Sequence, residues 1–372
     1  KVNVQIKRRG HLELIDFTIT RGKIPIYSVA VSYPLDAVTG YIKVTRFART
    51  THDEFMEGVR ELREKGMQQL IIDLRGNGGG YLNTAIEICE EILPKGSLIV
   101  YTEGKSQPRK TYNATRSGSL TEIPVVIMID QGSASASEIL SGAVQDNDRG
   151  VIIGRRSFGK GLVQEHYEFP DSSAIRLTVA RYFTPAGRSI QRPYGEGIDY
   201  AAEVYDRYET GELYDSTKID YPDSLTYETV AGRVVYGGGG IVPDVYVTLD
   251  TVGGSNYLTQ LSYRGIINDF AFDYADANRE RLMKKETAES FVAGFNVSDN
   301  LLSELYGFAE EQDLERDPIG IDTSEDIIAL RLKALIARNI WGNEAYYPII
   351  GKDDKMLHEA RAALGNYTAI LP

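Results

Sequence analysis

The chain has 372 residues, of which 42% are hydrophobic and 25% are charged, so it can bury a core and form about two or three domains. The excess of 53 Asp and Glu over 41 Lys and Arg gives a net charge of −12, which argues against a protein that wraps nucleic acid. The longest apolar run, Val125 to Ile129, is far shorter than the roughly twenty residues of a membrane span. Cys89 is the single cysteine, so there is no internal disulfide.

The first 27 residues predict a β-hairpin. Two alternating stretches, Val2 to Lys7 and Leu12 to Ile19, are joined through the polar segment 8–11. Because two strands cannot bury a core, we expect residues 1–27 to be an added sheet edge or the tail of another domain.

Residues 28–250 show short apolar strands that alternate with amphipathic helices, the pattern of an α/β layer with parallel strands. The expected strands are Gly40 to Val44, Leu70 to Leu74, Leu98 to Tyr101, Val125 to Ile129, Val151 to Ile153 and Ile175 to Val179. A helix is predicted from Thr51, with a Thr51 and Glu54 capping box, to a stop at Gly66.

Two further regions have a different character. Residues 190–240 are rich in Tyr and Gly with little periodicity, and we interpret them as a long surface insertion. From residue 251 to residue 372 apolar side chains recur at helical spacing, which predicts an appended helical region.

The densest run of small polar residues extends from Asp130 to Glu138, between the strand 125–129 and a helix predicted over residues 136–146. In a parallel sheet the ligand site lies beyond the carboxyl ends of the strands, where helix N-termini present free amides. Three serines, Ser133, Ser135 and Ser137, stand there. A helix N-cap is the alternative role for such a serine.

Lys160 is expected at the same sheet edge. The helix 136–146 descends by roughly 16 Å and the strand 151–154 returns by about 13 Å, so the next loop lifts Lys160 to the level of the serines. Its neighbours Phe158, Leu162 and Val163 could desolvate the ammonium and favour the neutral amine, although most lysines are simply solvated. A neutral lysine can accept a serine proton, as in Ser-Lys variants of the catalytic triad.

A glycine-rich turn, residues 73–81, follows the strand 70–74 and is suited to an oxyanion or phosphate nest. Competing motifs are incomplete: Gly161 replaces the Ser or Thr of a P-loop, and Tyr81 replaces the third glycine of a dinucleotide fingerprint. The four histidines form no zinc pattern, so neither metal nor cofactor is expected. His166 keeps a Ser-His pair open as a minor alternative.

Together, residues 132–138 and 157–164 resemble the C-terminal processing peptidases, also called tail-specific proteases. The resemblance extends back to residues 73–80 and forward through residues 182–188 to residues 240–244, and so covers roughly residues 28–250. It implies a crotonase-like, layered α/β protease core, a partial PDZ-like hairpin at residues 1–27 and an α-helical region at residues 251–372.

The resemblance also assigns roles. Ser135 would be the nucleophile, Lys160 the general base and Gln164 the group that orients the lysine. The amide of Ala136, with that of Gly79 or Gly80, would form the oxyanion hole, and the resemblance does not separate the two glycines. Ser133 and Ser137 are then expected to be capping or packing residues.

The resemblance implies a serine endopeptidase that cleaves proteins at or near their C-terminal tails, with protein or peptide substrates bound through their C-terminal segments. It implies export to the periplasm or cell envelope, although residues 1–27 contain no signal peptide. A homo-oligomer stays open, with dimerisation or regulation as roles for residues 251–372. The alternatives are a catalytically silent peptide-binding scaffold and, more weakly, acyl-thioester chemistry.

Overall fold

The computed structural model describes residues 1–8, 11–195, 202–219, 221, 223–285 and 287–371. Its strands are β1 (Val2–Ile6), β2 (Ile15–Ile19), β3 (Val29–Pro34), β4 (Thr39–Val44), β5 (Gln69–Asp73), β6 (Leu98–Glu103), β7 (Lys110–Asn113), β8 (Val125–Ile129), β9 (Val151–Gly154), β10 (Leu162–Glu168), β11 (Ala174–Phe183), β12 (Thr226–Glu228), β13 (Val234–Tyr236) and β14 (Val245–Tyr246).

Its α-helices are α1 (Thr51–Glu64), α2 (Leu82–Ile92), α3 (Ala136–Asp146), α4 (Glu203–Glu209), α5 (Asn256–Tyr263), α6 (Ile266–Lys285), α7 (Ala288–Gly294), α8 (Asp299–Glu310), α9 (Pro318–Trp341), α10 (Asn343–Ile350), α11 (Lys355–Gly365) and α12 (Tyr367–Ile370). No described helix is long and apolar enough to cross a membrane.

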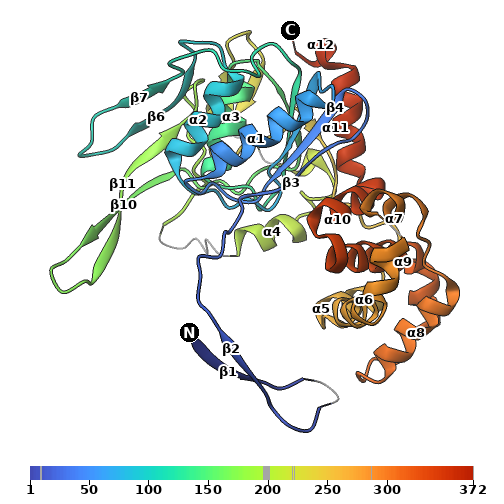
Figure 1. Cartoon of the computed structure of the whole chain (residues 1–372). Helices are drawn as coiled ribbons and strands as arrows, with labels where there is room; N and C mark the ends of the chain where they lie inside the picture. Colours follow the sequence, from blue (N-terminus) through green and yellow to red (C-terminus); the bar gives the residue numbers. More distant parts are fainter. Residues whose placement is uncertain (9–10, 196–201, 220, 222, 286, 372) are drawn as a thin grey trace.

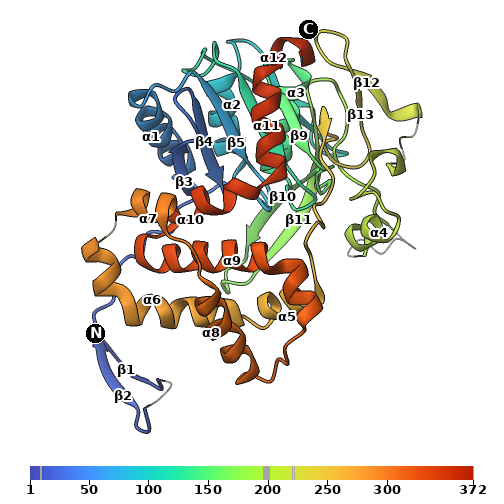
Figure 2. The ribbon, with the colours of Figure 1, turned by 90° about the vertical axis from the view of Figure 1, so that its right-hand side faces the viewer.

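The central sheet has six strands in the order β14-β9-β8-β5-β4-β3. All neighbours are parallel except β3, which pairs antiparallel with β4. One face of this sheet packs against α1, α2 and α3, and the other face is covered by α11, as Figures 1 and 2 show. The expected α/β layer is therefore present, with a core on both faces.

A second, four-stranded sheet has the order β10-β11-β6-β7 and is antiparallel throughout. It lies on the far side of α2 and α3 from the central sheet (Figure 1). The prediction that the strands at residues 98–101 and 175–179 join the parallel layer is therefore wrong. Both strands exist, but a short apolar run does not specify which neighbour it pairs with, because pairing depends on distant segments.

Helix α1 begins at the expected residue, but without the predicted capping box. Glu54 instead turns its carboxylate to the chain entering β3, where its Oε2 accepts the N–H groups of Ser28 and Val29 at 2.6 and 2.9 Å. The hydroxyl bonded to Glu54 belongs to Thr50, at 2.7 Å. The capping prediction is wrong because the Glu54 carboxylate accepts the N–H groups of Ser28 and Val29, which are distant in sequence, in place of an N–H group at the start of its own helix.

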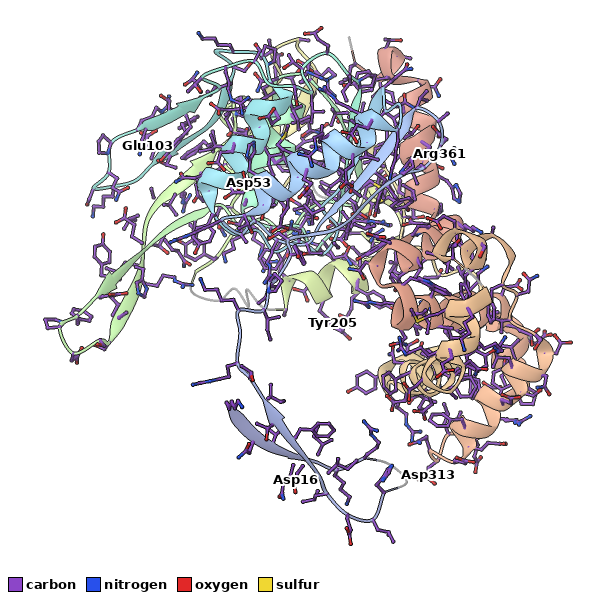
Figure 3. All side chains as sticks on the ribbon, viewed as in Figure 1. Asp16, Asp53, Glu103, Tyr205, Asp313 and Arg361 are labelled. Carbon is purple, nitrogen blue, oxygen red and sulfur yellow. The ribbon has the colours of Figure 1, made fainter. Side chains whose placement is uncertain are left out.

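Residues 1–27 contain the expected antiparallel pair, β1 and β2. The pair lies apart from the rest of the chain in Figure 1, and Asp16 marks it in Figure 3. Residues 9–10 of the predicted connection lie outside the described residues.

Residues 190–240 contain more regular structure than their composition indicates, namely α4 and the pair β12 and β13. Positions 196–201, 220 and 222 of this segment lie outside the described residues.

The C-terminal region is helical, as expected. Helices α5 to α10 share one apolar core around α9. Helix α11 leaves this cluster and lies along the central sheet (Figure 2), where Met356, Ala360 and Leu364 pack against β8 and β9. The last helices therefore complete the sheet core.

We expect Leu364→Ala to lower the free energy of unfolding by about 2–5 kcal/mol, because it removes a side chain that is 5% exposed from the core under the sheet. The matched control is Glu359→Ala, an exposed position on the same helix, with an expected change within about 0.5 kcal/mol. Urea unfolding followed by circular dichroism measures both. Equal midpoints for the two variants would show that α11 does not seal this core.

Candidate active site

Ser135 stands at the turn between β8 and α3, one residue before the first residue of the helix. Its backbone has a φ of 56°, in the region that L-residues rarely adopt. Such strain costs about 1–3 kcal/mol and is concentrated at functional sites. The side chain is half-buried. The turn therefore holds one serine in an uncommon conformation at the carboxyl edge of the sheet.

The two flanking serines hold this turn in place. Ser133 Oγ donates to the carbonyl of Leu74 at 2.8 Å, and Ser137 Oγ donates to the carbonyl of Asn77 at 2.8 Å. Both side chains are buried. Their hydroxyls thus fasten the serine turn to the glycine-rich turn after β5, in the packing role expected for them.

The glycine-rich turn lies directly against Ser135. A Cβ on Gly79 would lie 2.6 Å from the carbonyl oxygen of Ala134 and 2.9 Å from the amide nitrogen of Ala136, so only glycine fits there. The N–H of Gly79 donates to Asn77 Oδ1 at 2.9 Å. Within the described part of the chain, no hydrogen bond uses the N–H of Gly80 or of Ala136. The unused amides are therefore those of Ala136, the residue after Ser135, and of Gly80, which lines the same cavity as Ser135.

Asp73, the last residue of β5 and the first of the glycine-rich turn, anchors this turn through its buried carboxylate. Tyr41 donates to its Oδ2 at 2.7 Å, and Lys43 and Arg75 pair with it at 3.0 and 2.7 Å. Burial alone would raise the pKa of Asp73, but the two cations hold it well below its usual range. Arg75 also pairs with Asp354, the N-cap of α11, at 2.6 Å. The turn is thereby tied to the helix across the sheet.

Glu138 joins two segments: the serine turn, residues 130–135 between β8 and α3, and the Lys160 loop, residues 155–161 between β9 and β10. Its Oε2 accepts the N–H groups of Ser135 and Lys160, both at 2.8 Å. Its Oε1 accepts the hydroxyl of Ser157 at 2.5 Å and the N–H of Gly159 at 2.6 Å. Burial raises the pKa of this carboxyl, whereas the four donors favour its charged form. One fully buried side chain thus fixes the backbones of both candidate catalytic residues.

Ser135, Lys160 and Gln164 line one cavity of about 540 Å³, together with residues 78–81 of the glycine-rich turn. Lys160 is half-buried, whereas Gln164 is exposed on β10. Ser135 and Lys160, the two residues that the sequence singles out, therefore line the same cavity. A neighbouring cavity of about 810 Å³ shares Lys160 and has an apolar wall of Ala134, Phe158, Leu162 and Tyr194.

His166 lies further along β10, and its ring lines the Ser135 cavity as well. Its Nε2 is 3.6 Å from Glu168 Oε1, in an exposed pair. Across the described ranges, no three His, Cys, Asp or Glu side chains are grouped as metal ligands.

The Lys160 loop has a second support, from α4, which the sequence did not indicate. Arg207, only 2% exposed, donates from Nη1 to the carbonyl of Ser157 at 2.8 Å and from Nε to Glu203 at 2.8 Å. Arg192 places its guanidinium 3.9 Å from the ring centre of Phe158 and also pairs with Glu203. No sequence signal indicates these contacts with the loop, because Ser157 and Phe158 lie far from both arginines along the chain.

The geometry defines a class of site: a serine on a strained strand-to-helix turn, with free amides beside it and a lysine in the same cavity, suits nucleophilic acyl transfer. Residues 38–204 match the model of Peptidase family S41, which confirms the resemblance that the motifs indicate. Residues 257–342 match a family of unknown function, DUF8443.

Individual relatives agree with the family match. A carboxyl-terminal-processing protease of Synechocystis sp. is 38% identical over 196 residues, which are 52% of this chain and 45% of that protein. A carboxy-terminal-processing protease of Bartonella bacilliformis is 37% identical over 237 residues, which are 62% of this chain and 53% of that protein. This chain thus spans about half the length of these curated relatives. Among solved structures, the photosystem II D1 C-terminal processing protease is 32% identical with a TM-score of 0.39, covering 50% of this chain and 52% of that one.

We expect Glu138→Gln to lower the free energy of unfolding by about 2–6 kcal/mol, since an NH₂ group would replace one accepting oxygen and leave two buried donors unpaired at about 1–3 kcal/mol each. Denaturant unfolding measures the change. Glu87→Gln, an exposed position on α2, serves as the control for loss of one charge. If the two variants unfolded at the same denaturant concentration, Glu138 would not hold the two loops together.

Proposed function

We propose that this chain is a serine endopeptidase of the C-terminal processing type, which acts through an acyl-enzyme on Ser135 with Lys160 as the general base. The observation that carries the proposal is that the two side chains line one cavity while their backbone amides bond to the same carboxylate. A nucleophile and its base must come within hydrogen-bonding distance during the reaction, and a shared anchor supports this because it limits how far their backbones can separate.

In the proposed mechanism, the uncharged amine of Lys160 removes the proton from Ser135 Oγ as this oxygen attacks the carbonyl carbon of the scissile peptide. The carbonyl oxygen becomes an oxyanion that accepts the N–H groups of Ala136 and Gly80. Of the two glycines considered, Gly80 is favoured because the N–H of Gly79 is already bonded to Asn77. Lys160 then gives its proton to the leaving amine, and Gln164 orients the lysine.

Deacylation repeats these steps with water in place of the serine. Lys160 takes a proton from the water, the hydroxide adds to the ester carbon, and the same two amides hold the new oxyanion. Collapse breaks the bond to Ser135 Oγ, which regains a proton from Lys160. The product leaves with a new C-terminal carboxylate, and the free serine is restored.

The family resemblance supports several finer proposals. The core with two sheets and intervening helices is crotonase-like, with protease residues at 28–250, an insertion at 190–240 and an appended helical region at 251–372. Residues 1–27 are a PDZ-like hairpin. Substrates bind through their C-terminal segments, the protein acts in the periplasm or cell envelope, and it can form a homo-oligomer.

Ser135→Ala and Lys160→Met should each reduce cleavage of an unfolded, C-terminally tagged protein by at least about 10³-fold, because each removes one half of the proposed pair. Mass spectrometry of the products measures the loss. The free energy of unfolding, measured by thermal denaturation, should change by no more than about 1 kcal/mol in either variant. Turnover retained in both folded variants would rule out the mechanism, and a wild-type chain that binds but never cleaves would identify a scaffold.

We expect Arg207 to position the Lys160 loop, which carries the proposed general base. Arg207→Met removes the donor to the Ser157 carbonyl, and we expect kcat to fall about 10- to 100-fold with little change in KM, as for a displacement of about 1 Å. Arg207→Lys should recover part of the loss, and Glu209→Gln, exposed on the same helix, should change nothing. Kinetics are measured well below the unfolding temperature of each variant. An unchanged kcat for Arg207→Met would confine this arginine to a structural role.

A further inference from the structure

The cavity that contains Ser135 is lined by basic side chains, in a protein whose net charge is −12. Its described lining includes Lys160, His166 and Arg176, and neither Asp nor Glu. These side chains come from the loop before β10 and from the paired strands β10 and β11, which extend together beyond the body in Figure 1. The basic side chains therefore lie along one wall of the cavity.

Arg176 is the side chain in this wall whose charge the fold does not use. It lies on β11 opposite His166 of β10. No ion pair or side-chain hydrogen bond involves Arg176 within the described residues, although Glu168 lies 3.6 Å from His166. The nearby acid Glu165 occupies the next position on β10, where it bonds with Tyr167 and Gln107.

The two faces of this strand pair differ in character. Tyr167 pairs with Ile175, and Glu165 pairs with Leu177, so these side chains share one face. Gln164, His166 and Arg176 line the cavity from the other face. Arg176 is therefore presented to whatever occupies the cavity, and its guanidinium can bind a carboxylate through two parallel hydrogen bonds.

We propose that Arg176, assisted by His166, binds a carboxylate of the substrate on the C-terminal side of the scissile bond. This inference rests on the proposed peptidase function, because it assigns the end of the cavity away from Ser135 to the segment that is removed. The carboxylate belongs either to the free C-terminus of the substrate or to an Asp or Glu side chain.

The strand spacing limits where that carboxylate can lie. His166 follows Lys160 by six residues, so at about 3.3 Å per residue the two are separated by at most about 20 Å along the strand. An extended substrate has the same rise per residue. The carboxylate is therefore expected within about six residues of the cleaved bond, and the site selects for short tails.

The test compares peptides that carry tails of about two to ten residues beyond one cleavage sequence, each with a free or an amidated C-terminus. For the preferred tail length, the free acid should be cleaved with a kcat/KM about ten- to a hundredfold higher than the amide, the range of one charge-assisted contact. Arg176→Gln should abolish this difference, whereas Arg60→Gln, an exposed arginine on α1, should preserve it.

Two further measurements separate the outcomes. An amidated peptide with Asp at the preferred position should regain the advantage if side-chain carboxylates are accepted, and should not if only the C-terminus is read. Binding of the same peptides to Ser135→Ala protein, by fluorescence anisotropy, tests the carboxylate site without catalysis. Equal binding of acids and amides, or an equal loss of both in Arg176→Gln, would overturn the inference even where Ser135-dependent cleavage is established.

Discussion

The buried carboxylate of Glu138 is the interaction on which the site depends. Two loops that approach from different strands meet at this one side chain, which accepts a backbone N–H from Ser135 and another from Lys160. An isolated buried charge would be costly, and four donors offset that cost here. Because these two bonds are made to backbone amides, the carboxylate of Glu138 does not occupy the side chain of Ser135 or of Lys160.

The arrangement separates support from reaction. Ser133 and Ser137 bond to the glycine-rich turn, Ser157 bonds to Glu138, and Arg207 holds the carbonyl of Ser157. Each of these contacts lies behind the cavity wall. A preorganised site of this kind needs little rearrangement when charge develops on a substrate oxygen, and this is the condition under which amide donors are most effective.

The sequence predicts local elements well where one strong signal governs them. The bounds of β8 and the start of α3 agree with expectation because five buried apolar residues lead into a turn of small polar ones. Partner choice is different: β6 and β11 have the same apolar pattern as the parallel strands but pair in a second sheet. In the sequence, Glu138 is an ordinary acid in the first turn of a helix. Its bonds to the distant Lys160 loop were therefore not predictable.

The family match alone does not contain everything that the site requires. It covers residues 38–204, yet Ser157 accepts the N–H of Ile241 at 2.7 Å, and β14 completes the sheet beside β9. Asp354, the N-cap of α11, pairs with Arg75 of the glycine-rich turn. These long-range bonds connect the loops of Lys160 and of the glycine-rich turn to later parts of the chain. The position of the candidate nucleophile and base is therefore a property of the whole sheet and its covering helix, and a short sequence motif acquires its geometry only within them.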